Sequence, residues 1–134
     1  DYKNSVVLFE KAAANGYETK NDFNENLGFA SLYAGQYEKG EKLLTDVLKR
    51  KPNNKTLMRD MAEIFYGQKQ YDKSLEYCQM LMQLDPNDGK ALYQAGLNFQ
   101  KKGEKDRGQQ MCDKAIEMDP SLASLRKKKE IVGL

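Results

Sequence analysis

The sequence contains no histidine and no tryptophan, and it has only three prolines and two cysteines among 134 residues. Histidine is the commonest general base and the commonest metal ligand, so its absence argues against acid–base catalysis and against a metal site. Neither cysteine has the CxxC spacing of a zinc or redox site, and no glycine-rich phosphate loop is present. We therefore predict a protein that is not an enzyme, with no catalytic residues, no metal site and no cofactor.

Long hydrophobic runs are also absent. No apolar stretch reaches the roughly 18 residues that a membrane-spanning helix needs, and the chain does not open on a secretion signal. The net charge of +2 is too small to indicate a nucleic-acid partner or a membrane surface. These features predict a soluble protein with no membrane span and no nucleic-acid partner, and they leave the cytoplasm and the periplasm equally open.

What the chain does have is an internal repeat. The stretches 21–54, 55–88 and 89–122 can be written beneath one another without a gap, which gives a period of 34 residues. Such a period is typical of stacked helical hairpins. Three columns of the alignment are conspicuous: the prolines Pro52, Pro86 and Pro120, the small residues Gly28, Ala62 and Gly96, and the small residues Gly40, Ser74 and Gly108.

The recurring prolines and small residues fit the geometry of a helical hairpin. Each repeat has apolar residues at helical spacing in its front and back halves, which predicts two amphipathic helices joined by a short turn. The two small residues of a repeat lie 12 positions apart, one on each helix, and would let the two backbones approach closely. Each proline follows a back helix and ends it, because proline cannot continue the hydrogen-bond ladder.

The two ends of the chain differ from this pattern. Residues 1–20 match only the second helix of a repeat and close on Asn15-Gly16-Tyr17 in place of a proline. Residues 123–134 begin like a front helix but carry three consecutive lysines, which predicts a capping helix with a polar outer face. Cys78 and Cys112 are equivalent residues of adjacent repeats, about 10 Å apart at helix-packing distances, so we predict that both are free and buried.

The period, the closing Asp85-Pro86-Asn87 and the tyrosines after the turns, Tyr37 and Tyr71, resemble the tetratricopeptide repeat family. Lys105 departs from that pattern in the third repeat. The resemblance covers nearly the whole chain and implies an all-α fold, an α-α superhelix in which antiparallel helix hairpins form one right-handed solenoid over residues 1–134. It also implies a non-catalytic protein–protein interaction scaffold that binds a partner peptide or helix in a concave groove.

In the family, the front helices line that groove. The residues predicted to face it are those that the apolar core leaves over. They are Glu25, Asn26, Phe29, Tyr33, Arg59, Asp60, Glu63, Tyr66, Lys90, Tyr93, Gln94, Leu97 and Lys101.

Aromatic and apolar side chains on a wet face offer area for a partner to bury, whereas Arg59 could bind a carboxylate and Asp60 or Glu63 a basic side chain. For Phe29 and Leu97, packing against a neighbouring front helix is the alternative interpretation. The family's clamp for the C-terminal carboxylate of heat-shock chaperones is not expected here. Of the matching positions only Lys90 fits it, and Glu25 and Asp60 would repel a carboxylate.

Two rival hypotheses remain. The chain could be a structural spacer or a self-assembling scaffold, because an incomplete first hairpin would expose Val6, Phe9 and the inner side of Phe23 and so favour self-association. Alternatively, the basic residues of the third repeat could join the run 126–129 into an anion-binding end.

Overall fold

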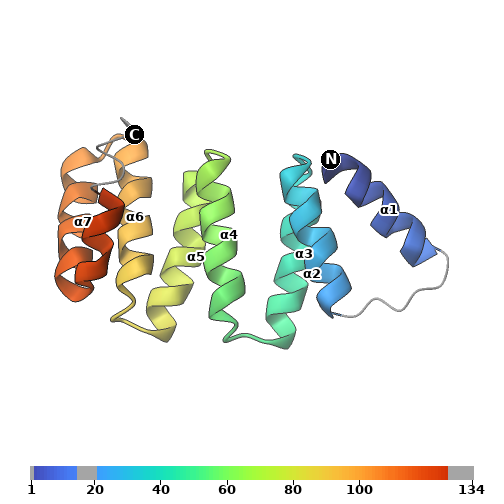
Figure 1. Ribbon diagram of the computed structural model, residues 1–134, viewed down its shortest axis with the longest axis horizontal. Helices are drawn as coiled ribbons and strands as arrows, with labels where there is room; N and C mark the ends of the chain where they lie inside the picture. Colours follow the sequence, from blue (N-terminus) through green and yellow to red (C-terminus); the bar gives the residue numbers. More distant parts are fainter. Residues whose placement is uncertain (1, 15–20, 127–134) are drawn as a thin grey trace. The chain divides into compact units, whose positions relative to one another are not determined.

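The computed structural model describes residues 2–14 and 21–126, and within these ranges the chain is helical with no strand (Figure 1). The predicted all-α repeat fold is therefore confirmed. The front helices α2, α4 and α6 begin 34 residues apart, as the sequence period requires. The elements are α1 (Tyr2–Ala14), α2 (Asn21–Tyr33), α3 (Tyr37–Arg50), α4 (Lys55–Gly67), α5 (Tyr71–Leu84), α6 (Gly89–Lys101), α7 (Lys105–Met118) and the 3-10 helix η1 (Pro120–Leu122).

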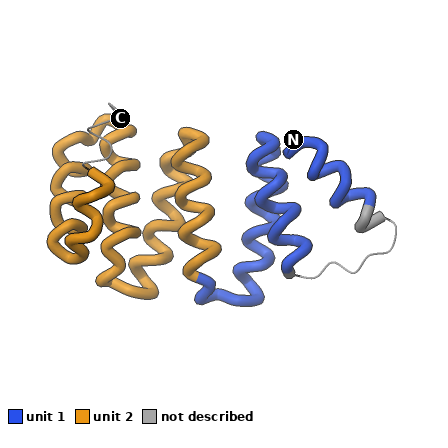
Figure 2. Tube along the Cα trace, in the orientation of Figure 1, with its two compact units in different colours: residues 1–54 blue, residues 55–134 orange. Residues whose placement is uncertain are grey.

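The contacts divide the chain into two compact units, residues 1–54 and residues 55–134 (Figure 2). Unit 1 contains α1 to α3, and unit 2 contains α4 to α7 with η1. Residues 123–126, at the start of the predicted capping helix, are helical, and 127–134 lie outside the described residues. The predicted closing turn at Asn15-Gly16-Tyr17 also lies outside them.

The small-residue columns form the seams of the hairpins, as predicted. In unit 1, a Cβ atom placed on Gly40 would lie 2.8 Å from the carbonyl oxygen of Gly28. In unit 2, a Cβ atom on Gly96 would lie 2.8 Å from the carbonyl oxygen of Gly108. Both distances are shorter than a side chain tolerates, so glycine is required where these backbones cross.

The middle hairpin has no glycine pair where its two helices cross. Its seam residues are Ala62 and Ser74, and the hydroxyl of Ser74 donates a hydrogen bond of 2.7 Å to the carbonyl oxygen of Ala62. The same hydroxyl accepts a 2.8 Å hydrogen bond from Nδ2 of Asn98, which is fully buried on α6. A polar relay thus connects α4, α5 and α6 through the core of unit 2.

Helix α1 packs on α2 in unit 1. Val6 is buried in a cluster with Leu27 and Ala30, and Phe9 meets Phe23 edge to face with ring centroids 5.3 Å apart. The expectation that the incomplete hairpin exposes Val6 and the inner side of Phe23 is thereby corrected, because the two helices cover these residues.

The turns within the hairpins use a left-handed residue. Gly35 has φ +85° and Gly103 has φ +96°, whereas the equivalent position of the middle hairpin is Lys69, with φ +61°. A side chain with a Cβ atom is strained in this region, so the middle turn carries a conformational cost that the other two avoid.

Both cysteines are free and buried, as predicted. Burial raises the pKa of the Cys78 thiol to about 12, only partly offset by a hydrogen bond with Ser74. The thiol is therefore protonated at neutral pH and behaves as a small apolar side chain.

Candidate functional site

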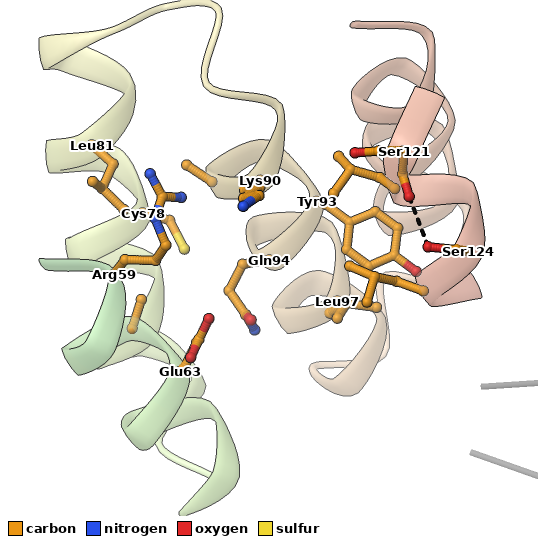
Figure 3. Close-up of a pocket in the computed structure, with 14 residues that line it drawn as sticks. Arg59, Glu63, Cys78, Leu81, Lys90, Tyr93, Gln94, Leu97, Ser121 and Ser124 are labelled. Atoms are coloured by element: carbon orange, nitrogen blue, oxygen red, sulfur yellow. Dashed lines mark hydrogen bonds between the residues drawn. The ribbon is translucent and has the colours of Figure 1, made fainter. Parts of the chain in front are cut away.

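Unit 2 contains a groove of about 820 Å³ between α4, α6 and the segment that follows α7 (Figure 3). Its floor includes residues of α5. This volume is within the range of small-ligand sites, so a short run of side chains can enter it. The lining residues are Arg59, Ala62, Glu63, Cys78, Leu81, Lys90, Ala91, Tyr93, Gln94, Leu97, Ser121, Leu122, Ser124 and Leu125.

The floor and the walls of the groove differ in their polarity and exposure. The apolar residues Ala62, Leu81 and Ala91 are among those that line the floor. Gln94 extends from α6 into the space between α6 and α4 (Figure 3). The far wall carries Leu125, whose side chain is 46% exposed. An exposed leucine beside an apolar floor is a place where a partner could bury surface.

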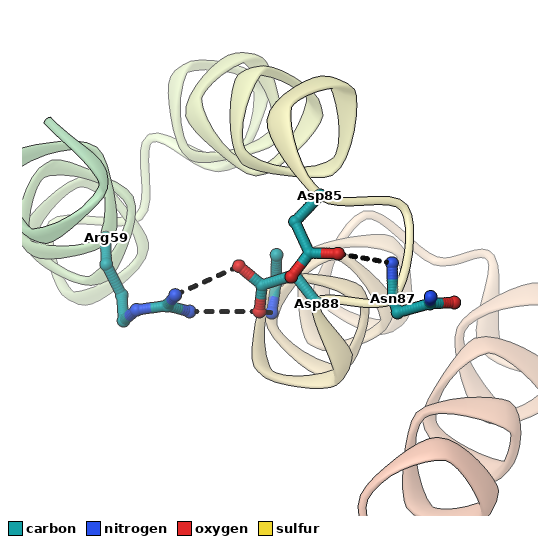
Figure 4. Close-up of polar contacts among 5 residues, drawn as sticks. Arg59, Asp85, Asn87 and Asp88 are labelled. Carbon is teal, nitrogen blue, oxygen red and sulfur yellow. Dashed lines mark hydrogen bonds and ion pairs between the residues drawn. The ribbon is translucent and has the colours of Figure 1, made fainter. Parts of the chain in front are cut away.

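One end of the groove is fixed by an ion pair that crosses from α4 to the α5–α6 loop (Figure 4). Arg59 donates from Nη2 to Oδ2 of Asp88 at 2.9 Å and from Nη1 to Oδ1 at 3.2 Å, which is a bidentate pair. Oδ1 of Asp88 also accepts a 3.0 Å hydrogen bond from the backbone N–H of Ala91 and so caps α6. Burial opposes ionisation of Asp88, but the hydrogen bonds from Arg59 and Ala91 outweigh it and lower the pKa of this carboxyl.

The opposite wall is held by Arg126, which donates to Oδ1 of Asp113 on α7 at 2.8 Å. Leu122 is buried beneath this segment, in a cluster with Tyr93 and Leu97 of α6. The segment 121–126 is therefore anchored both by packing and by an ion pair, which makes it a stable wall of the groove.

Tyr93 and Leu97 were predicted as members of a wet face, and the structure corrects their role. Tyr93 is only 5% exposed, and both side chains belong to the buried cluster with Cys112, Ala115 and Leu122. Burial raises the pKa of the Tyr93 hydroxyl, while the positive charge of Arg126 opposes the shift. Leu97 packs in this cluster against residues of α7 and η1, and it also lines the groove.

Tyr66 packs against the same cluster and meets Tyr71 edge to face with centroids 5.7 Å apart. Burial, with smaller contributions from Tyr71 and Cys112, raises the pKa of the Tyr66 hydroxyl. Tyr66 is not among the residues that line the groove.

The groove brings together six of the predicted residues: Arg59, Glu63, Lys90, Tyr93, Gln94 and Leu97. Asp60 and Lys101 do not line it. Arg59 was predicted to be available for a partner's carboxylate, but its guanidinium is already paired with Asp88. Asp88, the floor residues on α5 and the wall at 121–125 were not predicted from the sequence.

The predicted residues of unit 1 lie on α2. Asn26 and Tyr33 are exposed, Glu25 and Phe29 are half-buried, and the ring of Tyr33 stacks on Tyr2 with centroids 4.4 Å apart. Their participation in a binding surface stays a prediction.

Among the described residues, no group of three or more acidic, cysteine or histidine side chains is placed to hold a metal ion. No helix in the described part of the chain is both long and apolar enough to span a bilayer. The chemistry that the groove offers is therefore apolar burial, ion pairing and hydrogen bonding.

Comparison with known proteins agrees with this architecture. Family models described as tetratricopeptide repeat match residues 31–97 and 89–122. No curated protein sequence matches the chain.

Several solved structures share the fold. The structure of YrrB, described as a tetratricopeptide repeat protein with an unusual peptide-binding site, is 26% identical over 95% of this chain, with a TM-score of 0.69. The chain spans 66% of that structure's length. MamA from Desulfovibrio magneticus RS-1 is 21% identical, with a TM-score of 0.62, over 89% of this chain and 67% of its own.

The N-terminal domain of stress-induced protein-1 from C. elegans is 20% identical, with a TM-score of 0.65, over 82% of this chain and 94% of that domain. At these identities MamA and the stress-induced protein bear on the fold alone. The family models cover half of the chain and more, so the chain belongs to the tetratricopeptide repeat family, a family of protein-interaction scaffolds that are generally non-catalytic.

Proposed function

We propose that the groove of unit 2 binds a short peptide segment of a partner protein, and that the chain acts as a non-catalytic interaction scaffold. The observation that carries the proposal is the groove itself. An apolar floor is bordered by the charged side chains Glu63 and Lys90 and by the exposed Leu125, all in a space of about 820 Å³. Concave sites with apolar floors and a few polar groups are the usual form of binding sites.

The family supports the same function, since its members are interaction scaffolds. YrrB, one of the structures that share the fold, has a peptide-binding site. The site proposed for the present chain is argued from its own lining residues, because the two proteins are only 26% identical.

A matched pair of leucine variants tests the proposal. The probe is a phage-displayed library of random dodecapeptides, from which binders to the unaltered chain are selected, synthesised and measured by fluorescence anisotropy. Leu125→Arg places a charged side chain at the groove wall and should abolish binding of the selected peptides. Leu84→Arg, at an exposed leucine of α5 outside the groove, makes the same change and should leave affinity unchanged.

Two results would count against the groove. One is a selected set of peptides that binds Leu125→Arg as tightly as the unaltered chain. The other is a library that yields no binder at all. Circular dichroism spectra of both variants should match the unaltered chain, which separates a blocked groove from an unfolded one.

A second function, self-assembly through unit 1, is favoured by one observation. Two successive apolar side chains of α1 are exposed, Leu8 at 66% and Val7 at 46%. If this apolar face is an interface between copies, light scattering should show a mass that rises with concentration, and Leu8→Glu should abolish the rise. A mass that stays at one chain across the series removes this candidate.

A further inference from the structure

The polar relay in the core of unit 2 departs from the chain's own repeat pattern at both of its side chains. At the position of Asn98 the other repeats carry Ala30 and Ile64, which are apolar, and at the position of Ser74 they carry glycine. The two departures bond to each other, since Nδ2 of Asn98 donates to the hydroxyl of Ser74 at 2.8 Å. An apolar or small residue therefore suffices for the fold at both positions, and the relay belongs to one hairpin interface.

Stability alone does not explain why Asn98 is polar. The residue is fully buried, and its Oδ1 has no hydrogen-bond partner among the described residues. A buried acceptor without a partner is destabilising, because it loses its hydration and gains no hydrogen bond in return. Leucine has the same shape as asparagine and would avoid this loss. The polar side chain must therefore contribute something other than stability.

The relay reaches one groove-lining residue on each of three helices. The hydroxyl of Ser74 donates to the carbonyl oxygen of Ala62 on α4 at 2.7 Å, and it also forms a hydrogen bond with the thiol of Cys78 on α5. Nδ2 of Asn98 donates to the carbonyl oxygen of Gln94 on α6 at 3.1 Å, which fixes the orientation of the Asn98 amide. Ala62, Cys78 and Gln94 all line the groove (Figure 3).

Resting on the proposed function, we propose that Asn98 and Ser74 are positioning residues for peptide binding, which hold α4, α5 and α6 at the spacing that the groove requires. Neither side chain lines the groove, so both act through Ala62, Cys78 and Gln94. Directional hydrogen bonds restrict the relative movement of the three helices more than apolar contacts do. A groove whose lining residues are already in place binds a peptide with a smaller loss of conformational entropy.

An apolar replacement of the whole relay tests the proposal. Asn98→Leu keeps the shape of the side chain, and Ser74→Ala removes the hydroxyl that would otherwise lose its partner. In the double variant the urea midpoint should stay the same or rise, because removing both partners leaves no new unpaired group. Fluorescence anisotropy should show that the dodecapeptides selected with the unaltered chain bind the double variant roughly three- to tenfold more weakly.

Asn98→Leu alone gives a second test. It keeps the hydrogen bond from Ser74 to Ala62 and removes only the connection to α6, so it should reproduce most of the loss of affinity.

Met61→Leu is the matched control for both variants. It conserves the volume of a fully buried residue of α4 that does not line the groove, and it should change the affinity by less than about twofold. A loss in the control as large as that in the relay variants would show that any change in the core weakens binding, and it would overturn the proposal.

The outcomes separate this inference from the function on which it rests. Selected peptides that lose binding with Leu125→Arg but bind both relay variants as tightly as the unaltered chain would overturn the positioning role and leave the groove standing. A loss of affinity that is accompanied by an equal loss of stability would also overturn it, since the relay would then act only as core structure. Peptides indifferent to Leu125→Arg would overturn the proposed function and this inference with it.

Discussion

The middle hairpin, α4 with α5, differs from the hairpins on either side of it in the chain. The flanking hairpins cross at glycine pairs, Gly28 with Gly40 and Gly96 with Gly108, where a Cβ atom would strike the opposite backbone. The middle hairpin crosses at Ala62 and Ser74 and connects to α6 through Asn98. In all three hairpins two helices approach closely. The flanking hairpins achieve this with glycine at the crossing, and the middle hairpin with a serine hydroxyl that hydrogen-bonds to the opposite backbone.

The polar contacts that connect the helices around the groove lie at the middle hairpin. The polar relay and the Arg59–Asp88 pair both connect the middle hairpin with α6 or the loop before it, and both of these elements line the groove. Directional hydrogen bonds fix the relative position of helices more narrowly than apolar packing alone. The groove is thus lined by the hairpin whose helices cross at Ala62 and Ser74 instead of at two glycines.

The largest effect is expected at a glycine seam. Gly96→Ala would put a methyl group 2.7 Å from Sγ of Cys112 and 2.8 Å from a backbone oxygen, so the helices must separate. We expect a loss of about 2 kcal/mol in the free energy of unfolding, because overpacking outweighs the gain in helix propensity. Urea denaturation followed by circular dichroism measures it.

Gly67→Ala is the matched control for that change, since nothing lies within 4 Å of the added atom. It should stabilise the protein by up to about 1 kcal/mol. Equal effects of the two substitutions would contradict the steric account of the seam.

The polar seam should be less sensitive to loss of its hydroxyl than the glycine seam is to gain of a methyl group. Ser74→Ala removes the donor to the Ala62 carbonyl and one partner of Asn98, whose Nδ2 keeps its 3.1 Å hydrogen bond to the carbonyl oxygen of Gln94. We expect a loss of about 1–2 kcal/mol in the free energy of unfolding. A loss below a few tenths of a kcal/mol would mean that the relay contributes nothing beyond packing.

The ion pair beside the middle hairpin should appear in the pH dependence of stability. The pKa of Asp88 is lowered in the folded protein, so its contribution is present above the ordinary aspartate pKa of about 4 and is lost as pH falls through the folded value. Asp88→Asn should cost about 1.5 kcal/mol at pH 7, where the unaltered carboxylate is charged.

At acid pH, below the lowered pKa of Asp88 in the folded protein, the stabilities of Asp88→Asn and the unaltered protein should converge. Urea midpoints across that range measure the difference. A gap between the two proteins that is as large at acid pH as at neutral pH would show that charge is not what Asp88 contributes.

The smallest effect concerns the turn of the middle hairpin. Lys69 has φ +61° where the flanking turns use Gly35 and Gly103. Lys69→Gly should relieve that strain and raise the free energy of unfolding by roughly 0.5–1 kcal/mol, whereas Gly103→Ala should lower it by a similar amount. Thermal denaturation of both variants checks whether their midpoints move in opposite directions.

The period of 34 residues was enough to predict the helices, the seams and the free cysteines, because these follow from local spacing and side-chain size. The sequence analysis could not foresee that Arg59 and Asp88 form a pair, since their contact depends on how α4 packs against the loop before α6. The signal was present in the cap position of Asp88, ahead of an apolar helix start, but a cap does not reveal a second partner.

Tyr93 and Leu97 were misjudged for a related reason. The segment after α7 covers them, since both side chains lie in one buried cluster with Leu122. The basic character of residues 126–129 obscured that segment's packing, because a run of charges usually marks a solvated surface.

The central claim is that a partner segment binds between α4, α6 and the wall at 121–125. Backbone amide chemical shifts, recorded while a library-selected peptide is titrated into labelled protein, test it most directly. The largest changes should fall at Ala62, Glu63, Ala91, Gln94 and Leu125. Changes confined to the outer surface of α7 or to α1 would contradict the claim.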